Sequence, residues 1–243
     1  MKIYIRAFLF LLAALTLSSC IDMQRKIRLN SDGSGSEKIL ITLNKNSILA
    51  MQFALSKLDV DSVSIDEDIK EIQEMFKDTM YLAEIRKSFG NFAVKDSLKL
   101  ISVKEKSSTD STKSFEIYYS FSSVKNLIGD KLTMMPDDEI PVETEKKISP
   151  IDFIVKDNYF EFSYKLGKNS EVDTLKQYDS LKILSDKIME TVFGKSTISF
   201  EVITENKIIS SNADSWKGKN ALWNILMIDY MRKQRILNIK FEN

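Results

Sequence analysis

The chain has 243 residues, with 35 basic and 35 acidic side chains, no histidine and one cysteine, so its formal net charge is zero. A neutral chain without a basic stripe argues against nucleic acid as a partner. The missing histidine removes the commonest general base and the commonest metal ligand, so we expect no cofactor and no metal site. An apolar fraction of 43% and a charged fraction of 29% are typical of a folded globular protein.

The N-terminus has the order of a secretory signal peptide. Lys2 and Arg6 come before an apolar run over residues 7–15, and hydroxylated residues follow up to Ser19. The apolar run is about half as long as a membrane-spanning helix, which needs about 20 residues. We therefore expect residues 1–19 to be a signal peptide that is removed.

The sequence Leu17-Ser18-Ser19-Cys20 resembles the lipobox of bacterial lipoproteins. The resemblance implies acylation of Cys20, residues 20–23 as the anchor segment, and the membrane as a partner through the acyl chains. Two or more acyl chains hold a protein stably at the membrane, because each buried methylene group contributes about 0.8 kcal/mol to membrane binding. Ile21 replaces the aspartate of inner-membrane lipoproteins, which implies the outer membrane, facing the periplasm or the cell exterior. The alternative is an ordinary signal peptide that contains an unrelated cysteine.

The first half of the mature chain combines hairpins and amphipathic helices. Strands are expected on both sides of the turn NSDGSGS, and again on both sides of KSSTDSTK. Helical periodicity and a capping box at Ser64 and Glu67 indicate helices between these hairpins. The expected strands are 23–29, 38–43, 97–104 and 115–121, and the expected helices are 44–58, 64–87 and a short one over 124–132.

The second half continues the same pattern after a proline-containing loop. A hairpin with strands 151–155 and 159–164 precedes a helix over 181–192 that ends at Gly194. A β-rich tail follows, with expected strands 197–204, 207–210, 221–228 and 236–241. The sequence therefore predicts an α+β fold, with an antiparallel or mixed sheet and amphipathic helices packed on one face. We expect a single domain over residues 24–243, with a possible sub-boundary near 136–148.

Two stretches resemble LppM-type envelope proteins. They are LNSDGSG, soon after the signal peptide, and ISFEVITENKIISSNADSWKGKNALWNI, with Phe200, Asn212, Ala213 and Trp223 at their spacing. The resemblance covers about a quarter of the chain and implies a non-enzymatic α+β envelope domain with a role at lipid. Many such proteins end in a membrane helix, whereas this sequence ends at Asn243 without one, so we expect Cys20 to supply the anchoring. The family brings no catalytic residues.

Three groups could carry chemistry or binding. Ser122-Ser123-Val124-Lys125 matches the S-x-x-K motif of penicillin-recognising enzymes, and Ser210-Ser211-Asn212 could replace their S-x-N, but the third motif is missing. The acidic group Asp137-Asp138-Glu139 lies in a loop expected to be solvated, which does not favour acid catalysis. Trp216, in an expected loop, is the candidate for stacking on a ligand, whereas Trp223 is expected in the core.

These observations predict a lipid-anchored, non-catalytic lipoprotein of the cell envelope that binds an apolar ligand or a lipid. One alternative is a structural or adaptor lipoprotein that docks another envelope protein. The residual alternative is a serine-dependent, penicillin-recognising enzyme that uses the motif at Ser122.

Overall fold

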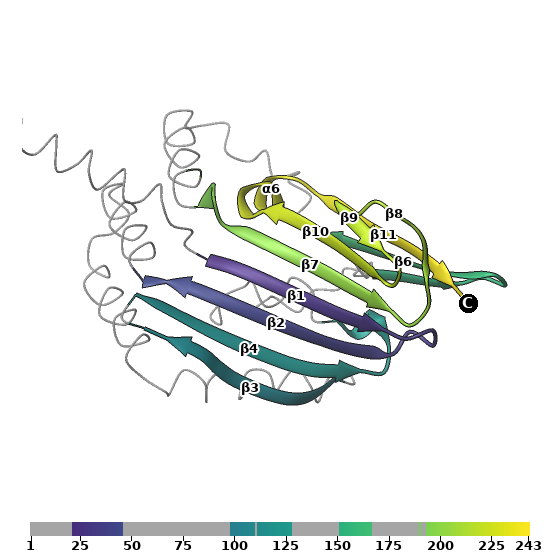
Figure 1. The fold of residues 1–243 in the computed structure, drawn as a ribbon, viewed down its shortest axis with the longest axis horizontal. Helices are drawn as coiled ribbons and strands as arrows, with labels where there is room; N and C mark the ends of the chain where they lie inside the picture. The colour runs from purple at the N-terminus through teal and green to yellow at the C-terminus, as the bar shows by residue number, and fades with distance from the viewer. Residues whose placement is uncertain (1–20, 46–97, 110, 128–150, 167–189, 191–192) are drawn as a thin grey trace, which may run out of the picture.

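The fold was analysed in a computed structural model, which describes residues 21–45, 98–109, 111–127, 151–166, 190 and 193–243 (Figure 1). Most of these residues belong to two β-sheets, sheet A with seven strands and sheet B with four. The strands of sheet A, in spatial order, are β3 (Leu98–Ser108), β4 (Thr112–Phe121), β2 (Gly35–Asn44), β1 (Ile21–Leu29), β7 (Thr197–Thr204), β10 (Asn220–Leu226) and β9 (Ser215–Lys217).

Sheet A is mixed, because one of its pairings joins distant parts of the chain in parallel. β1 pairs with β2 in antiparallel register from Ile21 opposite Leu43 to Leu29 opposite Gly35. On its other side β1 runs parallel to β7, with Met23 opposite Ile198. The remaining pairings are antiparallel, and β3 carries two register shifts against β4. The N-terminal hairpin is thus built into the middle of the sheet.

The turn between β1 and β2 explains the glycines of NSDGSGS. Gly33 has a φ of 80°, a conformation that glycine adopts without steric cost, and its N–H donates to the Asn30 carbonyl at 3.1 Å. The Asp32 side chain accepts from the Ser34 N–H at 2.8 Å. A Cβ atom at Gly35 would lie 2.0 Å from the Arg28 carbonyl oxygen, so only glycine fits at the start of β2.

Sheet B contains only antiparallel pairs. Its strands, in spatial order, are β5 (Ile151–Val155), β6 (Tyr159–Leu166), β11 (Arg235–Glu242) and β8 (Ile208–Ser211). Along β6 every second residue is buried, so Phe160, Phe162, Tyr164 and Leu166 point to one side. This alternation is what a sheet with one covered face requires.

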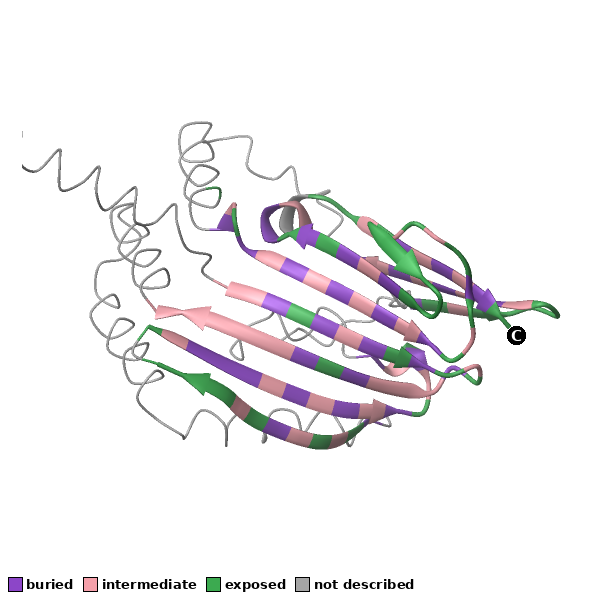
Figure 2. Ribbon diagram, viewed as in Figure 1, coloured by how far each residue is buried: buried purple, intermediate pink, exposed green. Residues whose placement is uncertain are grey.

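The core lies between the two sheets and is rich in aromatic rings. Tyr164 of sheet B packs edge-on against Phe200 of sheet A at 5.3 Å between centroids, and Phe200 packs against Trp223 at 6.4 Å. Figure 2 shows the alternation of buried and more exposed residues along the strands of sheet A. The largest side chains with less than 2% exposure include Trp223, Tyr119, Tyr164, Phe162, Phe200 and Phe241. Within the described residues, aromatic side chains therefore fill the space between the sheets.

The expected α+β class is wrong for the described chain, which is almost entirely strand. The longest described helix, α6 (Met227–Arg232), has six residues, and η1 (Val124–Asn126) is one turn of 3₁₀-helix. A second sheet, rather than amphipathic helices, packs against the inner face of sheet A at Phe200. The predicted helices 44–58, 64–87 and 181–192 fall almost wholly outside the described residues.

The individual strand predictions are largely confirmed, in contrast to the class. Each predicted strand overlaps a strand of the structure, and 151–155 and 197–204 match to the residue. The predicted end of the last helix is also confirmed, because the Gly194 N–H donates to the Glu190 carbonyl at 2.9 Å. The expected strand 221–228 ends at Leu226, where α6 begins. The expected sub-boundary near 136–148 lies outside the described residues.

Candidate functional site

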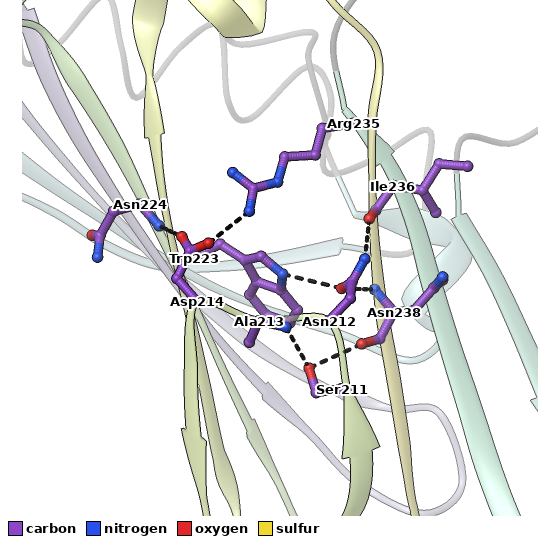
Figure 3. A network of polar contacts seen from close by, with 9 residues as sticks. All are labelled: Ser211, Asn212, Ala213, Asp214, Trp223, Asn224, Arg235, Ile236 and Asn238. Carbon is purple, nitrogen blue, oxygen red and sulfur yellow. Dashed lines mark hydrogen bonds and ion pairs between the residues drawn. The ribbon is translucent and has the colours of Figure 1, made fainter.

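A polar network centres on the side-chain amide of Asn212, just after β8 (Figure 3). Its Oδ1 accepts from the indole Nε1–H of Trp223 at 3.2 Å and from the backbone N–H of Asn238 at 2.9 Å. Its Nδ2 donates to the Ile236 carbonyl at 2.7 Å. Because Trp223 belongs to sheet A and the other two residues to sheet B, this one amide joins the two sheets.

Asp214 extends the network toward the molecular surface. Its Oδ2 accepts from the Asn224 N–H at 2.7 Å, and its Oδ1 accepts from Nη2 of Arg235 at 2.8 Å. Partial burial opposes ionisation of the carboxyl, but the hydrogen bonds from Asn224 and Arg235 outweigh it and lower the pKa of Asp214 below its ordinary value.

We expect a carbon-detected NMR titration of the Asp214 carboxyl group to give a midpoint below that of an unperturbed aspartate, which is about 3.9. Because the pKa of Asp214 is lower in the folded state than in the unfolded state, ionised Asp214 stabilises the fold at pH values above the unfolded-state pKa. This contribution is lost as the pH falls through the folded-state pKa. Arg235→Gln should raise the midpoint. An unchanged midpoint would show that the Arg235 contact has no effect on this carboxyl group.

A pocket of about 400 Å³ lies beside this network, next to α6. Its charged groups are already engaged, since Lys233 pairs with Asp229 at 3.2 Å and Arg235 pairs with Asp214 at 2.8 Å. The pocket is lined by Leu166, Asn224, Ile225, Leu226, Asp229, Tyr230, Lys233, Gln234 and Arg235. It therefore offers a small recess that is lined more by apolar than by polar surface, with no free charged pair among the described residues that could perform acid–base catalysis.

A second polar group, the Arg25 cluster (Arg25, Glu37, Tyr119 and Tyr164), is buried between the sheets. Nε of Arg25 donates to Oε1 of Glu37 at 2.6 Å, and its Nη1 donates to the Tyr164 hydroxyl at 3.0 Å. The Tyr119 hydroxyl donates to the other carboxylate oxygen of Glu37. The side chains of Arg25 and Glu37 are 5% and 0% exposed, so the ion pair is shielded from water.

The surroundings of Arg25 favour its charged form. Burial opposes the charge, but the Glu37 carboxylate, followed by Tyr164 and Tyr119, outweighs it and raises the pKa of the Arg25 guanidinium. The guanidinium carbon also lies 4.9 Å from the centroid of the Phe200 ring, within cation–π range. Nη2 has no hydrogen-bond partner among the described residues. The Arg25 cluster is closed to a ligand and suits a structural role.

The structure places Trp216 on β9, the edge strand of sheet A, and not in the expected loop. It lies opposite Ala221 and is 44% exposed, so its ring is accessible to a ligand. Trp223 is 0% exposed, which confirms the expectation that it belongs to the core. Cys20 and the acidic group 137–139 lie outside the described residues.

The structure does not bring the two serine motifs together. Ser123 caps η1 by accepting from the Lys125 N–H at 3.4 Å, and η1 packs against β5. Ser210 lies on β8, three strand positions from β5 in sheet B, which corresponds to roughly 14 Å. Asn212 is committed to the network described above. The structure therefore places Ser123 and Ser210 on different elements of the fold.

Sequence reasoning missed the Arg25 cluster and the role of Asn212. A signal for the first was present, because Arg25 and Glu37 occupy inward positions of the alternating pattern, next to Ile27 and Ile39. Two opposite charges at such positions on paired strands indicate a buried ion pair. No local pattern indicated the bonds of Asn212, whose partners lie 11 to 26 residues away.

The described residues contain no group of three or more acidic or cysteine side chains placed to hold a metal ion. None of the helices in the described part of the chain combines the length and apolar character needed to cross a membrane.

No family model and no curated protein matches the chain. Among solved structures, it is similar to the NMR structure of the folded domain of the LppM protein from Mycobacterium tuberculosis. The match has a TM-score of 0.40 and 10% sequence identity, and covers 92% of this chain and 90% of that chain. This is a distant similarity to the protein type that both ends of the sequence resemble.

Proposed function

We propose that this protein is a lipid-anchored, non-catalytic envelope lipoprotein that is attached through acylated Cys20 and works at the lipid surface. The observation that best supports this proposal is the start of β1 at Ile21, the residue after the cysteine. Ile21 pairs with Leu43, and its N–H contacts Oγ of Ser196 at 3.4 Å. An acylated Cys20 would hold sheet A next to the bilayer without a linker.

The lipid-binding part of the proposal concerns the membrane surface and not an enclosed cavity. In the described part of the chain, Tyr119, Tyr164, Phe162 and Phe200 fill the space between the sheets. Native cores are packed as densely as organic crystals, so the part of the interior that these described rings fill leaves no room for an acyl chain. The non-catalytic part is supported by the absence of histidine from the sequence and by the separation of the two serine motifs.

Cys20→Ser is expected to abolish incorporation of an alkyne-labelled palmitate when the full chain is expressed in a bacterium that processes lipoproteins. It should also release the protein from the membrane fraction, because the acyl chains supply most of the attachment. In-gel fluorescence after click labelling measures the first effect, and cell fractionation measures the second.

Ser19→Ala is the matched control, since it keeps a small residue before the cysteine and should leave labelling unchanged. The proposed acylation of Cys20 would be contradicted if the Cys20→Ser protein were labelled, or if the parent protein were not labelled. If the host has an outer membrane, we propose it as the location, and separation of the two membranes on a density gradient tests this choice.

A further inference from the structure

The outer face of sheet A, on the side away from sheet B, carries a set of basic side chains. Residues directly opposite each other in paired strands share a face, so the register places Lys104, Glu116 and Leu40 in one row, and Tyr118, Lys38 and Lys26 in the next. A third row contains Lys99 and Arg28. The charged residues of this outer face are Lys26, Arg28, Lys38, Lys99, Lys104, Lys106 and Lys217, with Asp22, Glu116 and Glu201.

Seven basic and three acidic residues give the outer face a formal charge of +4, although the whole chain is neutral. The positive charge of the outer face therefore reflects where the basic residues lie and not an excess of basic residues in the chain. Glu201 pairs with Lys26 at 2.9 Å, and Glu116 lies 3.5 Å from Lys106 and 3.9 Å from Lys38. Arg28, Lys99, Lys104 and Lys217 have no ion pair among the described residues, and all four are exposed.

Apolar side chains lie between these charges. Leu40, Tyr118, Ile203 and Leu222 share the outer face and are partly exposed, and the ammonium group of Lys38 lies 5.3 Å from the centroid of the Tyr118 ring. Ile101, at a register shift of β3, is 48% exposed. A broad sheet face that mixes cationic and apolar side chains suits the interface of an anionic bilayer, where headgroups and the upper acyl region are both within reach.

We propose that the outer face of sheet A binds the anionic headgroups of a lipid bilayer. The choice of a bilayer over another anionic surface rests on the proposed function, because β1 carries Lys26 and Arg28 and begins one residue after Cys20. Lipid attachment and a basic patch reinforce each other, as each alone binds less tightly than the two together.

The test uses the chain from residue 20 onward with Cys20→Ser, which cannot be acylated and keeps every described element. Its co-sedimentation is compared between vesicles of equal parts phosphatidylglycerol and phosphatidylcholine and vesicles of phosphatidylcholine alone, at low salt. We expect binding to the anionic vesicles only, and release by added salt, because exposed charges are screened.

The triple variant Arg28→Gln, Lys99→Gln, Lys104→Gln should bind the anionic vesicles about 100-fold more weakly, since each basic residue near such a surface contributes roughly 5-fold. The matched control is Lys125→Gln, Lys156→Gln, Lys207→Gln, which changes the net charge equally at exposed positions off this face. It should bind within about 3-fold of the parent. Far-UV circular dichroism confirms that all three proteins are folded.

Equal binding to neutral vesicles, equal loss in both triple variants, or no binding to either vesicle would overturn the proposal. These outcomes are independent of the anchor, because the Cys20→Ser chain carries no lipid. Failure of palmitate labelling would contradict the proposed anchor alone, and failure of vesicle binding would contradict the outer face alone.

Discussion

Arg25→Met is expected to lower the free energy of unfolding by about 3–5 kcal/mol, the cost of breaking a buried ion pair by removing one partner. The substitution leaves the Glu37 carboxylate 0% exposed and without its guanidinium, although the Tyr119 hydroxyl still donates to it. It also removes the bond from Nη1 to Tyr164, which joins sheet A to sheet B. Urea unfolding followed by far-UV circular dichroism measures the loss.

The double variant Arg25→Met, Glu37→Leu should be more stable than Arg25→Met alone, because no uncompensated charge then remains in the core. Lys26→Met, Glu201→Leu is the matched control on the opposite face of the same strand, where the pair is 41% and 29% exposed. Exposed pairs contribute little, so we expect a change below about 1 kcal/mol. A loss of that small size for Arg25→Met would contradict the structural role of the Arg25 cluster.

Local patterns were sufficient to predict the strands, because a half-buried strand alternates in a period of two along its own sequence. The segment 159–166 illustrates this, with Phe160, Phe162, Tyr164 and Leu166 all buried. The turn at Gly33 was equally local, since its φ of 80° follows from the chemistry of the turn. Such features need no knowledge of the rest of the chain.

The packing of sheet A on sheet B could not be predicted in the same way, because the arrangement depends on pairings between distant residues. β1 and β7 lie side by side although Met23 and Ile198 are 175 positions apart, and no local period encodes this pairing. Amphipathic helices were expected to cover the sheet, whereas rings such as Tyr164 in sheet B cover the inner face of sheet A. The Asn212 network joins separate strands whose residues lie 11 to 26 positions away, and it was missed because no local period encodes these contacts either.

The chain's two tryptophans should respond very differently to truncation. Trp223→Ala is expected to lower the free energy of unfolding by about 3–5 kcal/mol, because it empties a fully buried site and removes the edge-on contact with Phe200. It also removes the indole donor to Asn212 at 3.2 Å. Trp223→Phe keeps one aromatic ring but removes the second ring together with its N–H, so a smaller loss of about 2 kcal/mol is expected from the lost hydrogen bond and the small cavity.

Trp216→Ala is the matched control, since Trp216 is 44% exposed on the neighbouring edge strand β9. A substitution at such a surface position should change the free energy of unfolding by no more than about 0.5 kcal/mol. Far-UV circular dichroism is the right probe in urea, because each variant alters the tryptophan fluorescence. Equal losses for the two alanine variants would contradict the assignment of Trp223 to the core. A stable Trp216→Ala protein would leave the candidate ligand-stacking role of Trp216 open to a binding test without interference from unfolding.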